Sequence, residues 1–337
     1  MDASLIFLWC GTAALAAVAC WLWRPLARRM GFIDAPSHRS LHETPMVRSG
    51  GVVMVLAVAV GLAVHGDVGN GSLMLALALA AGLALVSALD DRKPLPVLPR
   101  LGSHLLACIL FVLLALSPPD WPLPVLAAAA IFAILALAWM TNLYNFMDGS
   151  DGLAGGQGAI GFAALGLLAL IAQAPQVAVI AFAVSGACAG FLVWNFPPAR
   201  LFLGDAGAIP LGFLAGALSF WLLLETRLTV WLLLLPFAPF WMDASYTLLR
   251  RMWQGARFWQ PHKEHAYQHL VQTGFGHRGT ALAAYGLMLG CGLVALAGAT
   301  LSADPWVHFT IFLVNFGTLV GVGVIIFLRK LSDFTDS

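Results

Sequence analysis

Long apolar stretches separated by short polar segments dominate this sequence of 337 residues. A helix needs roughly 20 apolar residues to cross a bilayer. Here 61% of the residues are hydrophobic and 10% are charged, whereas soluble domains carry about a quarter charged residues. We therefore predict an all-α, polytopic membrane protein with about eleven transmembrane helices. The expected spans are 4–23, 51–65, 72–89, 103–117, 124–141, 157–172, 176–193, 207–224, 229–247, 280–300 and 307–328.

The arginine and lysine residues predict the orientation of these spans. If successive connections alternate between two sides, sixteen of the seventeen fall on the side of segment 24–50, and Arg227 alone falls opposite. Positive residues concentrate on the cytoplasmic side, so we expect the N-terminus outside and the C-terminus in the cytoplasm. The formal net charge of +1 offers no extended basic surface, so no nucleic acid partner is expected.

The first cytoplasmic connection ends in a glycine pair at the start of a predicted helix. Glycines there let backbone N–H groups approach an anion, and basic side chains would add counter-charge. A positively charged loop with a glycine turn is the alternative, and the sequence leaves both open. The candidate residues of this connection are Asp34, His38, Arg39, His42 and Arg48, followed by Gly50 and Gly51.

Adjacent carboxylates, Asp90 and Asp91, end the third span in the segment SALDDRKPLPVLPRL, 87–101. Two neighbouring carboxylates at a membrane boundary repel each other unless a cation or proton is shared. A hard ion such as Mg²⁺ would serve, because it binds one or two carboxylates together with phosphate oxygens. Solvated carboxylates balanced by Arg92 and Lys93 are the alternative.

Two further polar segments follow. In TNLYNFMDGSDGLAGG, 141–156, Asn142, Asn145, Asp148 and Asp151 recur every third residue; on a helical turn this spacing gathers them on one side, where they could bind a nucleotide, a sugar or a metal. In WNFPPARLFLGDAGAIPLG, 194–212, Asp205 precedes a predicted helix. It is either a helix cap or, being on the same membrane face, a metal ligand.

The last cytoplasmic segment, QPHKEHAYQHLVQTGFGH, 260–277, is rich in histidine. His262, His265 and His269 are spaced to share one helical face. Carboxylates elsewhere favour Mg²⁺ over zinc, so we interpret these histidines and Lys263 as donors to a diphosphate. A basic helix on lipid headgroups is the alternative.

Together these segments supply carboxylates, amides, glycines and basic groups on one membrane face, which is typical of phosphoryl transfer. We predict one integral-membrane transferase domain, 1–337. Its active site is expected in the cytoplasmic loops 24–50, 90–102, 142–156, 194–206 and 248–279.

The order of DD at 90–91, NFMDGSDGLAGG at 145–156, FLGDAG at 202–207 and HKEHAYQ at 262–268 resembles the polyprenyl-phosphate N-acetylhexosamine-1-phosphate transferases, glycosyltransferase family four. The resemblance covers essentially the whole chain. It implies a bacterial inner-membrane enzyme that moves a sugar-1-phosphate from a UDP-N-acetylhexosamine to undecaprenyl phosphate and releases UMP. It also implies a need for Mg²⁺, for which Mn²⁺ could substitute, and contact with membrane lipids. Both a monomer and a homodimer are compatible with the sequence.

Carried over by the resemblance, Asp90 and Asp91 are the catalytic acidic pair, and which of them is the base stays open. Asp205 and Asp90 would bind the metal. Arg48, Asn142, Asn145, Asp148, Asp151, Lys263 and His269 would bind substrate, and His262 and His265 would assist catalysis.

The dispersed histidines resemble the branch that initiates O-antigen and other surface polysaccharides. This leaves GlcNAc, QuiNAc and FucNAc as candidate sugars. The peptidoglycan branch, which transfers phospho-N-acetylmuramoyl-pentapeptide, is the second candidate. Its members carry a tight run of three histidines, whereas the histidines of this chain are dispersed. Direct displacement and a covalent aspartyl intermediate both remain open.

A transporter of lipid-linked sugars is the alternative from another class. It predicts ionisable residues in mid-span, where this chain has little beyond Asp243. A CDP-alcohol phosphotransferase is excluded, because Asp151-Gly152 is followed by Leu-Ala-Gly-Gly without a further aspartate in that helix.

Overall fold

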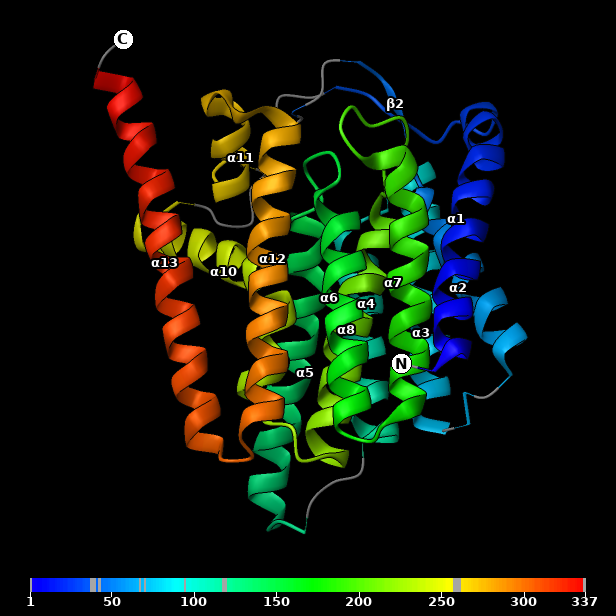
Figure 1. Ribbon diagram of the computed structural model, residues 1–337. Helices are drawn as coiled ribbons and strands as arrows, with labels where there is room; N and C mark the ends of the chain where they lie inside the picture. The colour runs from blue at the N-terminus through cyan, green and yellow to red at the C-terminus, as the bar shows by residue number, and fades with distance from the viewer. Residues whose placement is uncertain are drawn as a thin grey trace.

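The computed structural model describes residues 2–36, 41, 44–66, 68–69, 71–93, 95–116, 120–256 and 262–335, with side chains through residue 326. A bundle of long helices accounts for nearly all of it (Figure 1). The elements are α1 (Ala3–Arg29), β1 (Ile33–Asp34), β2 (Met46–Val47), α2 (Gly50–His65), α3 (Gly71–Arg92), α4 (Val97–Ala115), α5 (Leu123–Phe146), α6 (Leu153–Ile171), α7 (Pro175–Asn195), α8 (Asp205–Glu225), α9 (Val230–Leu234), the 3₁₀ turn η1 (Leu235–Phe237), α10 (Ala238–Trp253), α11 (Ala266–Leu270), the π-helical turn η2 (Val271–Phe275), α12 (Gly276–Leu301) and α13 (Pro305–Thr335).

The predicted all-α class is confirmed, apart from one short antiparallel ribbon in which Ile33 of β1 faces Val47 of β2. In the described part of the chain, ten helical segments are long and apolar enough to cross a membrane. The predicted span at 51–65 appears as α2, an apolar helix of 16 residues. At 1.5 Å per residue it is about 24 Å long, shorter than the roughly 30 Å hydrocarbon core.

Three helices, α6, α7 and α8, form the interior of the bundle, and most of each is buried. α1 and α6 pack on α7, whereas α3 and α5 pack on α8. Close approach depends on small residues: a Cβ at Gly190 of α7 would collide with the backbone of Ala13 in α1. Buried backbones thus contact directly, as in other membrane bundles.

The span predicted at 229–247 is not one straight helix. α9 lasts five residues, η1 follows, and α10 then runs across the bundle rather than along it (Figure 1). Pro236 and Pro239 lie at the break, and proline cannot supply the N–H that helix continuation requires. The prediction of a single span missed this change of direction, which brings the end of α10 beside α11.

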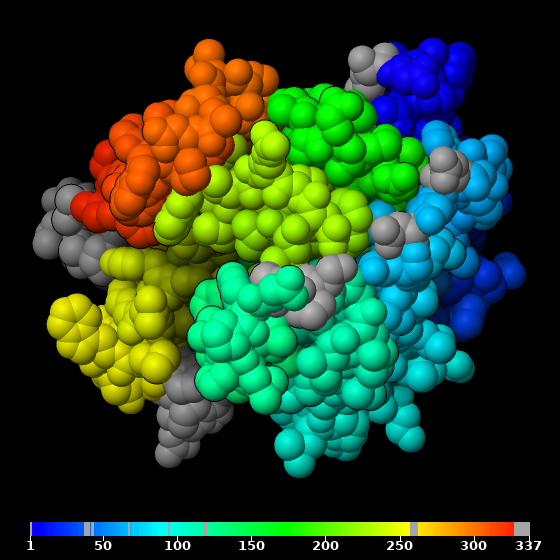
Figure 2. All heavy atoms as spheres, turned by 90° about the horizontal axis from the view of Figure 1, so that it is seen from below, coloured from blue at the N-terminus to red at the C-terminus, as the bar shows by residue number. Residues whose placement is uncertain are grey.

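The polar segments gather at one end of the bundle. The β1–β2 ribbon, the loop after α5, the loop after α7 and α11 all lie there (Figure 1). Figure 2 looks onto the opposite end, where the short connections after α6 (green), α8 (yellow-green) and α12 (orange) reach the surface. The predicted grouping of the chemically active loops is therefore a property of the fold.

Candidate active site

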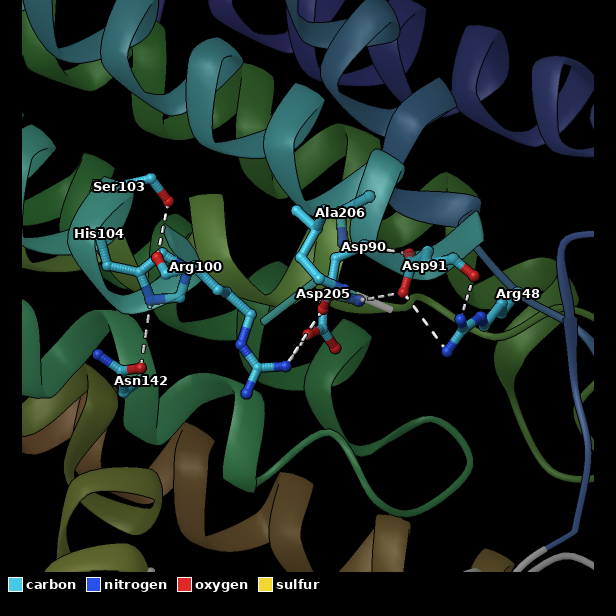
Figure 3. Close-up of polar contacts among 10 residues, drawn as sticks. Arg48, Asp90, Asp91, Arg100, Ser103, His104, Asn142, Asp205 and Ala206 are labelled. Carbon is cyan, nitrogen blue, oxygen red and sulfur yellow. Dashed lines mark hydrogen bonds and ion pairs between the residues drawn. The ribbon is translucent and has the colours of Figure 1, made fainter. Parts of the chain in front are cut away.

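Asp91, near the end of α3, is fixed by contacts from three directions (Figure 3). Ser49 Oγ donates a hydrogen bond of 2.7 Å to Oδ2, and Arg48 Nη1 lies 3.6 Å from Oδ1. The backbone N–H groups of Asp205 and Ala206, at the start of α8, point to the same carboxylate with N···O distances of 3.4 Å. A carboxylate is favoured at a helix N-terminus, so Asp91 joins α3 to α8.

Arg100 connects two further carboxylates, those of Asp90 and Asp205. Its Nη1 lies 3.2 Å from Asp90 Oδ2 and 3.9 Å from Asp205 Oδ2. Asp90 Oδ1 also accepts the N–H of Leu95 at 2.7 Å. The exposed fraction of the side chain is 1% for Asp91, 9% for Asp90 and 25% for Asp205, so Asp205 is the most accessible of the three.

The loop after α5 completes the carboxylate cluster, which we define as Asp90, Asp91, Asp148 and Asp205. The Asn145 side chain hydrogen-bonds Asp205, and Asp148 accepts the backbone N–H of Gly204. Burial raises the pKa of Asp148 well above its usual range, and the nearby charges of Asp205 and Asp91 add to the effect. A cation bound among these carboxylate oxygens would balance their buried negative charge.

The glycine pair at the start of α2 serves packing. The N–H groups of Gly50 and Gly51 donate to the carbonyls of Phe202 and Leu203, at 2.9 Å each. A Cβ at Gly51 would collide with the backbone of Gly207. Of the two interpretations left open, the described contacts therefore favour the turn, because these N–H groups are not available to an anion. His38, Arg39 and His42 lie outside the described residues.

The three-residue spacing of 141–156 does not place all four polar side chains on one helical face, because α5 ends at Phe146. Asn142 turns to α4, where its Oδ1 lies 3.2 Å from His104 Nδ1. Asp151 Oδ2 accepts the N–H of Ala199 at 2.9 Å, and Oδ1 lies 4.0 Å from His277 Nδ1. Of the four, only Asn145 and Asp148 contact the start of α8: Asn145 contacts Asp205, and Asp148 contacts Gly204.

The three histidines do not share a helical face, which corrects that prediction. His265 is the N-cap of α11 with extended backbone, His262 precedes it in irregular chain, and only His269 is helical. Asp243 of α10 anchors this segment: it accepts the N–H groups of Ala266 and Tyr267 at 2.9 and 3.2 Å. The His265 ring contacts Asp243 as well, with Nδ1 3.5 Å from Oδ1.

The histidine segment, residues 262–269, is also held at its start and at its side. Glu264 forms ion pairs with Arg250 and Arg251 of α10. Tyr267 donates its hydroxyl to the carbonyl of Phe146 at 3.1 Å, which joins the segment to the loop that bears Asp148. Lys263 lies half-buried between His262 and Glu264.

Burial lowers the pKa of His262 to about 4, and His265 and Arg251 contribute to the shift. The His262 and His265 rings lie 4.9 Å apart, centroid to centroid. At pH 7 the His262 ring is therefore neutral, so it could donate one hydrogen bond to a phosphate but would add no positive charge to the site.

The structure thus gathers one group of predicted residues: Asp90, Asp91, Asp148, Asp205, Asn145 and Arg48. It places His262 and His265 near Asp243, in a segment that also carries Lys263 and His269. Sequence reasoning missed three contributors. Arg100 contributed only to the charge count, Ser49 was not singled out, and His277 is the last residue of segment 260–277. None has a sequence signal, because each acquires its partner through tertiary contact.

The carboxylate cluster offers only oxygen donors, which suits Mg²⁺ or Mn²⁺. Among the described residues, no three His, Cys, Asp or Glu side chains form a complete metal cage. Mg²⁺ seldom needs one, since it keeps waters and binds substrate phosphates. Asp205, which is more accessible than Asp90 and Asp91, and Asp90, which shares Arg100 with it, are the residues that would hold such an ion.

Comparison with known proteins shows the family to which this chain belongs. The family model described as glycosyl transferase family 4 matches residues 73–223. A decaprenyl-phosphate N-acetylglucosaminephosphotransferase of Mycobacterium tuberculosis (strain CDC 1551 / Oshkosh) is 30% identical over 364 residues, covering 93% of this chain and 86% of the relative. A probable undecaprenyl-phosphate N-acetylglucosaminyl 1-phosphate transferase of Bacillus subtilis (strain 168) is 27% identical over 301 residues, covering 86% of this chain and 84% of the relative.

A membrane-embedded bundle with an acidic and basic cluster at one end defines a phosphoryl-transferring membrane enzyme. The chain belongs to glycosyl transferase family 4, the polyprenyl-phosphate hexosamine-1-phosphate transferases, and is a glycosyl-1-phosphate transferase. The second candidate branch is represented by a phospho-N-acetylmuramoyl-pentapeptide-transferase of Salinispora arenicola (strain CNS-205), 52% identical over 44 residues, only 13% of this chain and 12% of the relative.

Proposed function

We propose that this protein transfers an N-acetylhexosamine-1-phosphate from a UDP-sugar to undecaprenyl phosphate in the bacterial inner membrane, giving undecaprenyl-diphospho-sugar and UMP. The supporting observation is the contact of Arg100 with both Asp90 and Asp205, which lie where polar loops meet membrane-spanning helices. The near full-length relatives are named for polyprenyl-phosphate N-acetylglucosamine phosphate transfer, and the pentapeptide transferase matches only a short segment.

Each part of the cluster has a proposed task. Asp205 and Asp90 hold Mg²⁺, which when bound neutralises phosphate charge. Arg48 and Arg100 supply fixed positive charge toward the diphosphate. Asp91 is already saturated by Ser49, Arg48 and the start of α8, so it positions these groups, and Asp90 is the better candidate for contact with the reacting lipid phosphate.

Tyr267 connects the histidine segment to the loop that bears Asp148. We assign this segment to the sugar end of the donor. Its dispersed histidines support the O-antigen or other surface polysaccharide branch. The sugar is one of GlcNAc, QuiNAc and FucNAc under this proposal.

The experiment uses purified protein in detergent with undecaprenyl phosphate, Mg²⁺ and one labelled donor at a time: UDP-GlcNAc, UDP-QuiNAc, UDP-FucNAc or UDP-MurNAc-pentapeptide. We expect labelled lipid and UMP in equal amounts from one of the first three donors. Transfer from the pentapeptide donor alone would assign the protein to the peptidoglycan branch. No product from any donor by folded protein would contradict the proposal.

A further inference from the structure

A buried histidine lies one helical turn deeper in α4 than Arg100. His104 is 2% exposed, and its position four residues after Arg100 places it on the same helix face. It lies within electrostatic reach of Arg100, Asp205 and Asp90, and Figure 3 shows it beside Arg100 and Asn142. An ionisable residue inside a membrane-spanning segment is costly and usually functional, yet the proposed mechanism does not use it.

The hydrogen bonds of Asn142 determine which ring nitrogen of His104 carries the proton. Asn142 Nδ2 donates to the Ala138 carbonyl at 2.7 Å. A carbonyl oxygen only accepts, so the amide nitrogen must face it and the amide oxygen must face His104. That oxygen lies 3.2 Å from Nδ1 and can only accept, so Nδ1 carries the hydrogen. In the neutral ring, Nε2 is then an acceptor.

Among the described residues this acceptor has no hydrogen-bond partner, and it is inaccessible to solvent. Buried polar atoms are nearly always paired, and an unpaired one is costly. Asn142, in turn, has both polar atoms of its amide engaged inside the protein. Its contribution is therefore to orient His104, in the way a neighbouring carbonyl fixes a functional histidine.

We propose that His104 is a substrate-binding residue whose Nε2 accepts a hydrogen bond from an O–H or N–H group of a bound substrate, with Asn142 as its positioning residue. The inference rests on the proposed function. Arg100, one turn away and 39% exposed at its side chain, has room to move when phosphates bind. The donor group is either a hydroxyl or amide of the UDP-sugar or the P–OH of the lipid phosphate.

Kinetics with each substrate varied in turn distinguish these two sources. His104→Phe keeps the ring shape but removes the acceptor, and we expect kcat/KM to fall at least fivefold for the substrate that provides the donor group. His104→Gln keeps an acceptor and should retain more activity than Phe. His65→Phe is the matched control, because His65 ends α2 at the opposite end of the bundle; it should behave as wild type. His104→Phe within twofold of wild type for both substrates would overturn the proposal.

A spectroscopic measurement gives a readout independent of turnover. In ¹⁵N-histidine-labelled protein, with His104 assigned by its loss in His104→Gln, we expect Nδ1 protonated and Nε2 unprotonated. Saturation with UDP-GlcNAc alone or undecaprenyl phosphate alone should shift the Nε2 resonance toward that of a hydrogen-bonded acceptor. A proton on Nε2 in the free protein, or no shift with either compound, would overturn the assignment. This measurement tests whether His104 Nε2 accepts a hydrogen bond from a substrate even if the transfer assay fails or if His104→Phe does not fold.

Discussion

The backbone N–H of Asp205 points to the carboxylate of Asp91, with N and Oδ1 3.4 Å apart. One carboxylate therefore stabilises the start of the helix that presents the other. Asp91 is nearly inaccessible, whereas Asp205 is a quarter exposed. We therefore propose different tasks for these two of the four carboxylates: Asp91 positions the site, and Asp205 contacts substrate or metal.

We expect Asp91→Asn to lower stability by about 1–3 kcal/mol. The amide nitrogen would face the N–H of Asp205 if it replaces Oδ1, or the N–H of Ala206 and the Ser49 hydroxyl if it replaces Oδ2. Thermal unfolding in detergent measures the effect. Ser49→Ala, which removes one donor, should cost less. Equal melting temperatures for wild type and Asp91→Asn would refute a positioning role.

Asp205→Asn should leave the fold intact and abolish Mg²⁺-dependent turnover. The N-cap of α8 is Gly204, and Asp205 is an acidic residue of its first turn; the loss of that charge costs the helix about 0.3–1 kcal/mol, too little to unfold the protein. A lost metal carboxylate costs several kcal/mol of charge stabilisation, which corresponds to roughly a hundredfold or more in kcat. Turnover is measured across a Mg²⁺ titration; near-normal activity at low Mg²⁺ would remove Asp205 from the metal site.

Asp243→Ala should disorder the histidine segment and lower kcat although Asp243 is outside the carboxylate cluster. It removes the acceptor for the N–H groups of Ala266 and Tyr267, and a lost cap costs about 1 kcal/mol. Thr247→Val is the control, since it removes only one donor to Asp243. Hydrogen exchange of residues 262–270 should accelerate in Asp243→Ala; unchanged exchange would contradict the anchor.

Acidification should destabilise wild type more than His262→Gln. The pKa of His262 is about 4 in the folded protein and about 6.5 when unfolded. Between these values the unfolded state binds more protons, so stability falls as pH drops from 6.5 towards 4. Melting temperatures of both proteins from pH 7.5 to 4.5 provide the comparison. Parallel curves would show that His262 titrates normally.

Cysteine labelling tests the predicted orientation. Lys93 and Asp120 are both exposed and lie in connections at opposite ends of neighbouring helices. In a variant without the native cysteines, Lys93→Cys should resist a membrane-impermeant thiol reagent in intact cells, whereas Asp120→Cys should react. The reverse pattern would place the active site outside the cell.

Much of the site could be predicted because its residues come in local groups. Asp90-Asp91, the Asn145–Asp151 run and Gly204-Asp205 are each visible within a few positions, and the apolar stretches between them require helices in a membrane. What failed was the extension of regular spacing beyond a helix end. α5 stops at Phe146 and α11 begins only at Ala266, so Asp151 and His262 adopt directions that no helical period describes.

The membrane-spanning helical class and the grouping of the polar loops can be inferred from the amino-acid sequence, because both follow from local hydropathy and charge. The family motifs it contains indicated the transferase. Three contacts depend on the tertiary structure: Asp91 supports the start of α8, Arg100 joins Asp90 to Asp205, and Asn142 contacts His104. Each of these pairs lies on different helices, and hydrogen-bond partners between helices depend on packing distance and orientation, which no linear spacing encodes.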